Sequence, residues 1–336
     1  MECDTLLRIR DVAAVAGIAQ STVHKSIKSK GLKTITLGNK KYLPPSSVRK
    51  ILEDRGFQYS SCSKPLIISV NGMKGGIGKT SIATAISEGG SRLGFRTLCA
   101  DLDMQGNLSN SFKVRKHGVK VLIDLISEKD VRPADIIRKV HEYLDIIPSN
   151  LSNSHLENAL TQKAINYPTY FESLFNELYP NYDLIVLDCP PSINKATTCA
   201  TFFADFNLIP VNADYDSFDG VNQSVSEIKR LEDAFRKPGT INYGILFNKY
   251  DAREKLSMEI MGLLGNQDIL KNYVMPLVIR TDTAFKNTKA AGGHIFDLTK
   301  SNAKEDCLSL ILELTGLRKF FSKDNTPEMN DELETV

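Results

Sequence analysis

The sequence of 336 residues has no long hydrophobic run, and none of its apolar stretches approaches the roughly 18 residues that a membrane-spanning helix needs. Its first residues, Met1-Glu2-Cys3-Asp4, are acidic where a signal peptide would be basic, and no apolar segment follows them. With 21 glycines and 13 prolines, the chain is neither collagen-like nor of low complexity. We therefore expect a globular, cytoplasmic protein without a membrane partner.

The six cysteines form no CxxC pair and match no zinc-site spacing. Isolated cysteines of this kind are usually reduced thiols in a reducing compartment. We therefore expect free thiols in a cytosolic protein rather than a structural zinc site.

The formal net charge of +2 hides an uneven distribution of charge along the chain. Residues 1–64 hold twelve Lys or Arg and five Asp or Glu, whereas residues 65–323 hold 30 of each kind. Residues 324–336 hold five acids and no basic residue. A small basic unit on a neutral body is typical of an appendage that binds nucleic acid.

We divide the chain into a basic domain (1–56), a polar, serine-rich linker (57–64), a large domain (65–320) and an acidic tail (321–336). The large domain alternates short β-rich runs with helical segments. Its expected strands are Leu66–Val70, Thr97–Ala100, Leu144–Ile147, Leu184–Leu187, Asn207–Val211, Ile241–Phe247 and Tyr273–Ile279, and its expected helices include Ser81–Leu93, Phe171–Leu178, Val221–Phe235 and Ala303–Leu314. Several strands are apolar on both faces, as strands covered by helices on both sides must be. The pattern predicts an α/β fold with a doubly wound, mostly parallel sheet.

A glycine-rich loop lies between the first strand and the first helix of this domain, and it reads Asn-Gly-Met-Lys-Gly-Gly-Ile-Gly-Lys-Thr over residues 71–80. Such a loop turns backbone N–H groups toward phosphate oxygens at a helix N-terminus. Lys79 is expected on the β- and γ-phosphates and Thr80 on Mg²⁺. The strict P-loop pattern requires glycine where Met73 stands, and an additional lysine, Lys74, lies inside the loop. The expected phosphate-binding residues are Lys74, Gly75, Gly76, Ile77, Gly78, Lys79, Thr80 and Ser81.

Acidic residues follow two later strands, where phosphoryl transfer would need a metal holder and a group that orients water. Asp101 and Asp103 lie in Asp-Leu-Asp-Met-Gln-Gly-Asn, and Asp188 ends the apolar run Leu184–Leu187. An acid at the end of a buried strand has Walker B geometry and can reach Mg²⁺ directly or through water. Asn248 ends another strand, and its amide could read an adenine edge or be an ordinary strand-end residue.

These motifs resemble the deviant Walker A loop, KGGxGKT, and the DxDxQGN motif of the ParA/MinD family of ATPases, and the resemblance covers residues 65–315. It implies a SIMIBI-like P-loop NTPase fold with ATP and Mg²⁺ as cofactors. It also implies that Lys74 reaches the phosphates of the partner in a sandwich dimer, that Asp103 positions the hydrolytic water and that Asp101 lies near the metal. In MinD-like members, the residue matching Asn248 contacts adenine.

Within the family, the acidic end of the chain differs from the amphipathic membrane-targeting helix of MinD-type members. Cys189 lacks the context of the cluster-binding cysteines in nitrogenase iron proteins. The ParA branch remains, which implies a weak Mg-dependent ATPase and homodimer stimulated by a ParB-like centromere-binding protein and associated with the nucleoid. In that branch, basic residues of the C-terminal segment hold DNA without sequence preference. We choose Arg280 and Lys286 for this role, with a plain solvated face as the alternative.

Residues 7–28 fit a helix-turn-helix, with a small residue at Ala13 and Gly17 where the turn requires positive φ. Alternation around Gly38-Asn39 predicts a β-hairpin, or wing, followed by a helix at Ser46–Glu53. The whole is similar to a winged helix of the MerR type, and a small protein-contact domain is the alternative. The expected DNA-contacting residues are Gln20, Ser21, Thr22, His24, Lys25, Lys28, Lys40 and Lys41. Larger partition ATPases use such a domain to bind their own operator, which implies autoregulation here.

Two other functions remain open on the sequence. One is a nucleotide-sensing transcriptional regulator, in which DNA binding by the N-terminal domain is the output. The other is a P-loop metabolic enzyme of the same superfamily, such as an amide ligase or a small-molecule kinase.

Overall fold

The computed structural model describes residues 5–59, 64–114, 118–235 and 238–323. Half of the expected linker and most of the expected acidic tail therefore lie outside the described residues. Among the described helices, none is long and apolar enough to cross a membrane.

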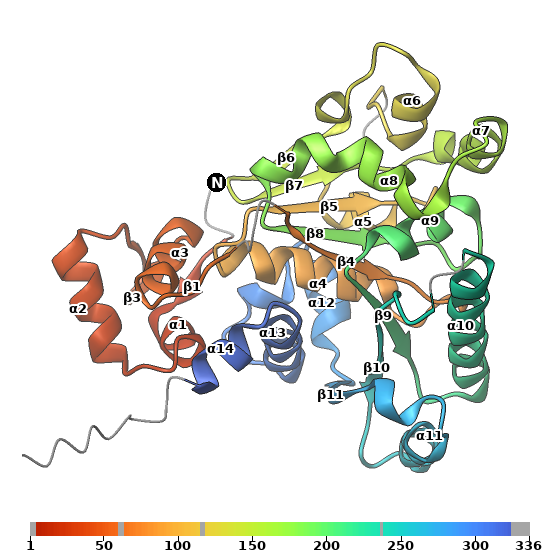
Figure 1. The fold of residues 1–336 in the computed structure, drawn as a ribbon. Helices are drawn as coiled ribbons and strands as arrows, with labels where there is room; N and C mark the ends of the chain where they lie inside the picture. Colours follow the sequence, from red (N-terminus) through yellow and green to blue (C-terminus); the bar gives the residue numbers. More distant parts are fainter. Residues whose placement is uncertain (1–4, 60–63, 115–117, 236–237, 324–336) are drawn as a thin grey trace, which may run out of the picture.

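Eight strands form the main sheet in the order β11-β10-β9-β4-β8-β5-β7-β6 (Figure 1). All neighbouring pairs are parallel except β6 and β7, which are antiparallel. The bounds are β4 (Leu66–Val70), β5 (Thr97–Asp101), β6 (Arg138–His141), β7 (Leu144–Ile147), β8 (Leu184–Asp188), β9 (Phe206–Val211), β10 (Tyr243–Tyr250) and β11 (Val274–Arg280). The predicted fold class is confirmed. The polar edge strand β6 was not predicted, because it lacks an apolar run.

Helices cover both faces of this sheet, and the alternation of side chains along each strand explains why. On β4, Ile68 and Val70 pack in the core that includes α4 (Lys79–Arg92) and α13 (Asn302–Leu314). Ile67 faces the other core, which includes α8 (Tyr167–Phe175) and α9 (Lys195–Phe203). The remaining elements are α5 (Asn107–Ser111), α6 (Leu122–Ser127), α7 (Leu156–Gln162), α10 (Tyr215–Ala234), α11 (Lys255–Asn266), α12 (Ala284–Ala290) and α14 (Leu317–Lys323), with 3₁₀ turns η1 (Pro133–Ile136), η2 (Leu151–His155), η3 (Asn176–Asn181), η4 (Lys271–Tyr273) and η5 (Ile295–Asp297).

The N-terminal unit has its own three-stranded antiparallel sheet in the order β1-β3-β2. Ala13 is buried between the first two helices, and Gly17 adopts a φ of 62° in the turn between them. The elements are β1 (Leu7–Arg8), α1 (Ile9–Val15), α2 (Gln20–Lys30), β2 (Ile35–Leu37), β3 (Lys40–Leu43) and α3 (Pro45–Asp54). Two helices, a hairpin and a third helix thus occur where the sequence places them, while the winged-helix class itself stays a prediction.

The N-terminal unit packs against the large domain rather than standing apart from it (Figure 1). Arg49 on α3 donates one hydrogen bond of 2.6 Å to the buried Asp183 carboxylate and another of 2.9 Å to the Gly94 carbonyl. The hydroxyl of Tyr59 donates to the Leu93 carbonyl at 2.7 Å. The described end of the expected linker is therefore part of the core, and the division into separate domains stays a prediction.

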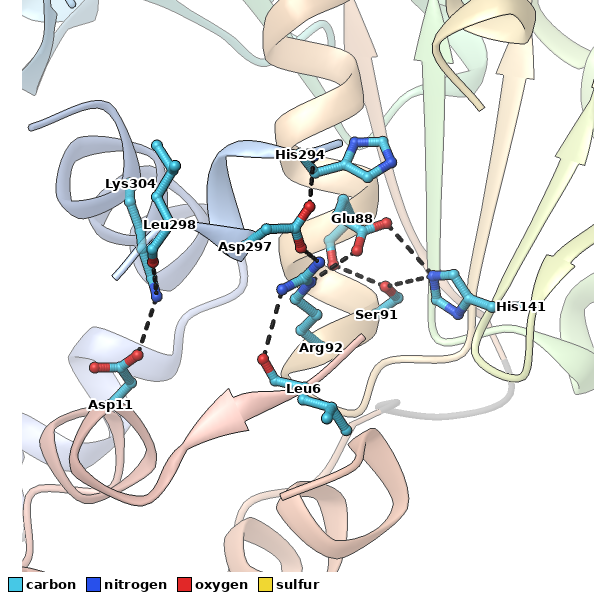
Figure 2. A network of polar contacts seen from close by, with 10 residues as sticks. All are labelled: Leu6, Asp11, Glu88, Ser91, Arg92, His141, His294, Asp297, Leu298 and Lys304. Atoms are coloured by element: carbon cyan, nitrogen blue, oxygen red, sulfur yellow. Dashed lines mark hydrogen bonds and ion pairs between the residues drawn. The ribbon is translucent and has the colours of Figure 1, made fainter. Parts of the chain in front are cut away.

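A buried polar network joins the C-terminal end of α4 to the N-terminal unit (Figure 2). Arg92 donates to Glu88 at 2.7 Å, pairs with Asp297 and lies 3.5 Å from the carbonyl oxygen of Leu6, which precedes β1. Burial alone would raise the pKa of Glu88, but Arg92 and His141 lower it to about 2. The helix that begins at the glycine-rich loop therefore ends at a contact with the N-terminal unit.

Candidate nucleotide-binding site

Three strand ends bring the predicted site residues to one edge of the sheet. In the strand register, Val70 of β4 pairs with Asp188 of β8, and Asp188 pairs with Asp101 of β5. The glycine-rich loop leaves β4 directly after Val70, and α4 begins at Lys79. Because parallel strands end at a common edge, the loop and both acidic motifs meet there, as the sequence predicts.

The glycines of the loop adopt backbone conformations that other residues avoid. Gly76 has a φ of 78° and Gly78 has a φ of 94°, both in the left-handed region. A Cβ atom at Gly78 would overlap the side-chain amide of Asn248, so a larger residue does not fit there. Among the described residues, the N–H groups of Ile77 and Gly78 have no acceptor. Free N–H groups in such a turn form a cradle for an anion.

Lys79 lies inside this cradle, and its side chain is buried. Its Nζ donates to the carbonyl oxygen of Lys74 at 2.8 Å. Burial lowers the pKa of Lys79, although Asp188 and Asp103 act in the opposite direction. A desolvated ammonium group that donates to a neutral carbonyl rather than to a carboxylate is well placed for an anionic ligand.

Asp188 is fully buried, and neither of its carboxylate oxygens has a hydrogen-bond partner among the described residues. Burial and the neighbouring Asp101 raise the pKa of Asp188 well above its ordinary value, while Thr80 and Lys79 oppose that shift. A buried carboxylate without partners is costly unless a cation or ordered water satisfies it. Mg²⁺ is commonly held by one or two carboxylates together with water, so Asp188 and the Thr80 hydroxyl fit this metal.

Asp101 lies beside Asp188, but its oxygens are already engaged. One accepts hydrogen bonds from the N–H and hydroxyl of Ser109 at 2.8 and 2.7 Å, and the other accepts from the N–H of Asp103 at 3.2 Å. Burial raises the pKa of Asp101 to about 6. These hydrogen bonds hold the loop from Asp101 to Ser109 in place. Asp103, within that loop, is partly exposed at the site. Ser109 carries no recognisable sequence signal.

The additional lysine of the loop forms an ion pair within its own chain. The Nζ of Lys74 pairs with Asp214 and lies 3.4 Å from Asp216, and these bonds raise the pKa of Lys74. Asp214 also caps α10 by accepting from the N–H of Ser217 at 2.7 Å. Asp214 was not predicted from the sequence, because it lies three residues past the end of β9 rather than at the strand end as Asp188 does. The available signal was an acid at the N-cap of the helix that follows.

Asn248 and Lys249 both contact the glycine-rich loop. Asn248 is buried and its amide nitrogen donates to the Ile77 carbonyl at 2.7 Å, while the Nζ of Lys249 donates to the Gly76 carbonyl at 3.0 Å. The donor that was expected to read adenine therefore holds the loop in this structure. Lys249 was not expected, because nothing in the sequence marks its backbone conformation.

The residues expected to contact DNA lie in two places. Those of α2 and the hairpin are exposed on the N-terminal unit: Gln20, Ser21, Thr22, His24, Lys25, Lys28, Lys40 and Lys41. In the C-terminal segment, Arg280 is bound by Asp306 through hydrogen bonds of 2.6–3.1 Å, and Glu305 lies 3.8 Å from it. Lys286 is exposed and has no ion pair with a described residue. Lys286 is therefore freer to meet a phosphate than Arg280 is.

The fold and the loop at its strand ends define a P-loop nucleotide-binding protein. A family model described as an AAA domain matches residues 66–241, just over half of the chain. The chain belongs to this family, among the ParA-type P-loop ATPases.

Relatives and solved structures agree with this membership. A chromosome-partitioning ATPase, Soj of Treponema pallidum, is 29% identical over 220 residues, which cover 65% of this chain and 85% of that protein. The ATP complex of McdA from Cyanothece superposes with a TM-score of 0.65 at 18% identity, over 76% of this chain and 98% of the other. Cobyrinic acid a,c-diamide synthase of Mycobacterium smegmatis, solved with ADP and magnesium, gives a TM-score of 0.64 at 21% identity, over 76% and 96%. At these identities, the two structures establish the fold alone.

Proposed function

We propose that this protein is a DNA partition ATPase of the ParA type that binds ATP and Mg²⁺ at the loop between β4 and α4. One observation carries the proposal: Lys74, Lys79 and the buried carboxylate of Asp188 meet the free N–H groups of the glycine-rich loop at the edge of the sheet where the parallel strands end. Chromosome partition is the activity named for Soj of Treponema pallidum, which is similar over 65% of this chain.

In this proposal each part of the site has one task in ATP hydrolysis. The loop N–H groups and Lys79 bind the phosphates, and Thr80 with Asp188 holds the metal, in part through water. Mg²⁺, when bound, neutralises charge on the phosphate oxygens. Asp103, which is partly exposed at the edge of the site, orients the attacking water. Asp101 keeps the Asp103 loop in place through its bonds to Ser109.

Lys74 couples nucleotide binding to dimerisation in this proposal. Its side chain reaches the phosphates of a second subunit when it leaves Asp214 and Asp216. The resulting sandwich dimer binds DNA without sequence preference. Lys286 contacts the DNA, and Arg280 does so once it leaves Asp306. A ParB-like partner then accelerates slow hydrolysis and dissolves the dimer. The exposed residues of α2 and the β2–β3 hairpin bind the operator of the protein's own operon.

The proposal is tested on the full chain by measuring Mg-dependent ATP hydrolysis with and without duplex DNA of random sequence. We expect slow hydrolysis that requires Mg²⁺ and an ATP-dependent gel shift of the DNA. Lys79→Ala is the negative control, because it removes the phosphate-binding ammonium group. Hydrolysis that requires a small-molecule co-substrate and ignores DNA would favour the metabolic-enzyme alternative instead.

A nucleotide-sensing transcriptional regulator is distinguished by the source of its DNA binding. In that alternative all DNA binding belongs to the N-terminal unit, so substitutions on α2 abolish it. A partition ATPase with the same substitutions keeps its ATP-dependent, non-specific binding. Deleting residues 1–59 is a poor test, because the deletion removes Arg49 from the buried Asp183 and removes Phe57 from Phe320 and Phe321 of α14.

A further inference from the structure

The N-terminal unit carries a group of lysines that no described acid neutralises. Two lie on α2, one lies between α2 and β2, and two lie on β3. Each is exposed and forms no ion pair with a described residue, whereas Lys30 and Lys50 both pair with Asp54. Helix α2 itself contains no acidic residue. We call this group the basic surface, and its members are Lys25, Lys28, Lys33, Lys40 and Lys41.

Helix α14 ends against the same N-terminal unit. The rings of Phe320 and Phe321 lie with their centroids 5.5 and 6.4 Å from the ring of Phe57. The guanidinium group of Arg55 lies over the Phe321 ring, 5.8 Å from its centroid. Helix α14 also contacts α1, which in turn packs against α2 (Figure 1). The described part of the chain therefore ends at Lys323, beside the unit that carries the basic surface.

The thirteen residues that follow α14 in the sequence are complementary in charge to this surface. Residues 324–336 contain five acids and no Lys or Arg, and the basic surface contains five lysines. Acidic segments of this kind often act as interaction segments. The five acids are Asp324, Glu328, Asp331, Glu332 and Glu334.

The length of this segment is sufficient to reach the basic surface. An extended chain advances about 3.3 Å per residue, so thirteen residues span at most about 40 Å. Packed helices lie about 8–10 Å apart, so the two steps from α14 through α1 to α2 amount to about 20 Å. The eleven residues of α2 add about 16 Å along its axis. The segment can therefore lie along α2 without any rearrangement of the described elements.

We propose that residues 324–336 bind the basic surface of the same chain and compete with DNA for it. The inference rests on the proposed function, because it names the regulation of the operator contact assigned to α2. A tethered segment has an effective concentration on the order of 1 mM. A contact with a dissociation constant of about 0.1 mM then occupies the surface roughly nine-tenths of the time and weakens DNA binding about tenfold. Such a loss empties weakly bound sites of random sequence before it empties a tight operator.

The test converts all five acids of the segment to their amides in the full chain. Fluorescence anisotropy without nucleotide measures the affinity for a short duplex of random sequence, so that the ATP-dependent dimer does not contribute. At low salt, we expect this amide variant to bind about tenfold more tightly than the unmodified protein. The difference should shrink as salt rises, because salt screens the competing contact. The substitutions are Asp324→Asn, Glu328→Gln, Asp331→Asn, Glu332→Gln and Glu334→Gln.

Two matched variants separate competition from a general change of net charge. The first converts five exposed acids of the large domain to amides and should bind the duplex within about twofold of the unmodified protein. The second adds Lys25→Gln and Lys28→Gln to the amide variant, and the gain over the two lysine substitutions alone should fall below about threefold. The acids changed in the first variant are Glu128, Asp130, Glu172, Glu177 and Asp268.

Carbodiimide coupling reports the contact itself, because it joins a carboxylate to a lysine that touches it. Mass spectrometry should find cross-links from residues 324–336 to the lysines of the basic surface. Dilution should not remove them, since both partners belong to one chain, whereas excess duplex DNA should remove them.

The outcomes distinguish this inference from the proposed function. If the amide variant binds DNA no more tightly than the unmodified protein, or if the large-domain control gains as much, the competition is wrong and the proposed ATPase stands. Cross-links to Lys286 or Lys289 of α12 in place of the basic surface would also overturn it. If neither the unmodified protein nor the amide variant binds duplex DNA without nucleotide, the proposed operator contact and this inference fail together, and the proposed ATP hydrolysis is unaffected.

Discussion

Lys74 and Asp214 form an ion pair within one chain, which links the glycine-rich loop to the first turn of α10. In the proposed dimer, Lys74 must instead contact the phosphates bound by the second subunit, so it cannot keep its pair with Asp214. Closing that dimer therefore exchanges a carboxylate partner for a phosphate partner. In this proposal the pair with Asp214 is the state of Lys74 in the monomer. Substitutions at either residue should therefore change how readily the dimer forms.

Substitutions at Lys74 and Asp214 should have opposite effects on dimerisation. Lys74→Ala should abolish the dimer formed with Mg-AMPPNP, because the cation between the two triphosphates is lost. Asp214→Asn keeps the helix cap but removes the competing charge, so it should lower the AMPPNP concentration needed for dimerisation about threefold. Light scattering after size exclusion measures both effects, and a Lys74→Ala protein that dimerises normally would contradict the sandwich.

Asp103 should affect turnover without affecting nucleotide binding. Asp103→Ala should bind ATP and retain ATP-dependent DNA binding, while hydrolysis falls at least a hundredfold because the water is no longer oriented. Single-turnover hydrolysis and a gel shift on the same sample measure the two properties. Loss of ATP binding in this variant would show that Asp103 supports the loop rather than the chemistry.

Asp188 should stabilise the protein only when magnesium is bound. Its carboxylate is buried without a hydrogen-bond partner among the described residues and lies beside a second acid. Asp188→Asn should therefore raise the stability of the ligand-free protein by about 1–2 kcal/mol. It should also remove the additional thermal stabilisation that Mg²⁺ gives to the ADP complex. Thermal unfolding with ADP in EDTA and in Mg²⁺ tests this, and an unchanged Mg²⁺ effect would exclude Asp188 as a metal holder.

Glu88 should make stability depend on pH in the acid range. Its folded pKa of about 2 lies below the ordinary value of 4.5, so its contribution is complete above pH 4.5 and disappears as pH falls toward 2. Glu88→Gln should cost about 3 kcal/mol of unfolding free energy at pH 7 and much less near pH 2.5. Urea unfolding at both values measures the difference. Glu128→Gln, in an exposed pair with Lys120, is the control and should change little.

The lysines of α2 should contribute salt-dependent DNA binding that is separate from the ATPase. Lys25→Ala with Lys28→Ala should reduce the slope of log affinity against log salt by about two for operator-containing DNA. ATP hydrolysis and ATP-dependent binding to random DNA should remain. Lys255→Ala is the control, because Lys255 begins α11, which lies on the opposite side of the molecule from α2 (Figure 1). An unchanged slope would favour a protein-contact role for the N-terminal unit.

Local patterns in the sequence were sufficient to predict the fold class, seven of the eight strands of the main sheet and which residues meet at their ends. Double-faced apolar runs identified the buried strands, since Leu184–Asp188 is buried at every position. The glycine spacing identified the loop because left-handed backbone is accessible to few other residues. The acids at the ends of those strands could be predicted to lie close together, because parallel strands end at one edge of the sheet.

Only the tertiary structure could show which partners these residues have. It pairs Lys74 with Asp214, engages Asp101 with Ser109, and turns Lys249 toward Gly76 through a bulge that has no sequence signature. It also buries Tyr59 against the large domain, although the surrounding residues are polar and serine-rich. Side-chain period and turn residues are local properties of a chain. The contacts between residues of different elements depend instead on how those elements pack, and a single sequence does not record that packing.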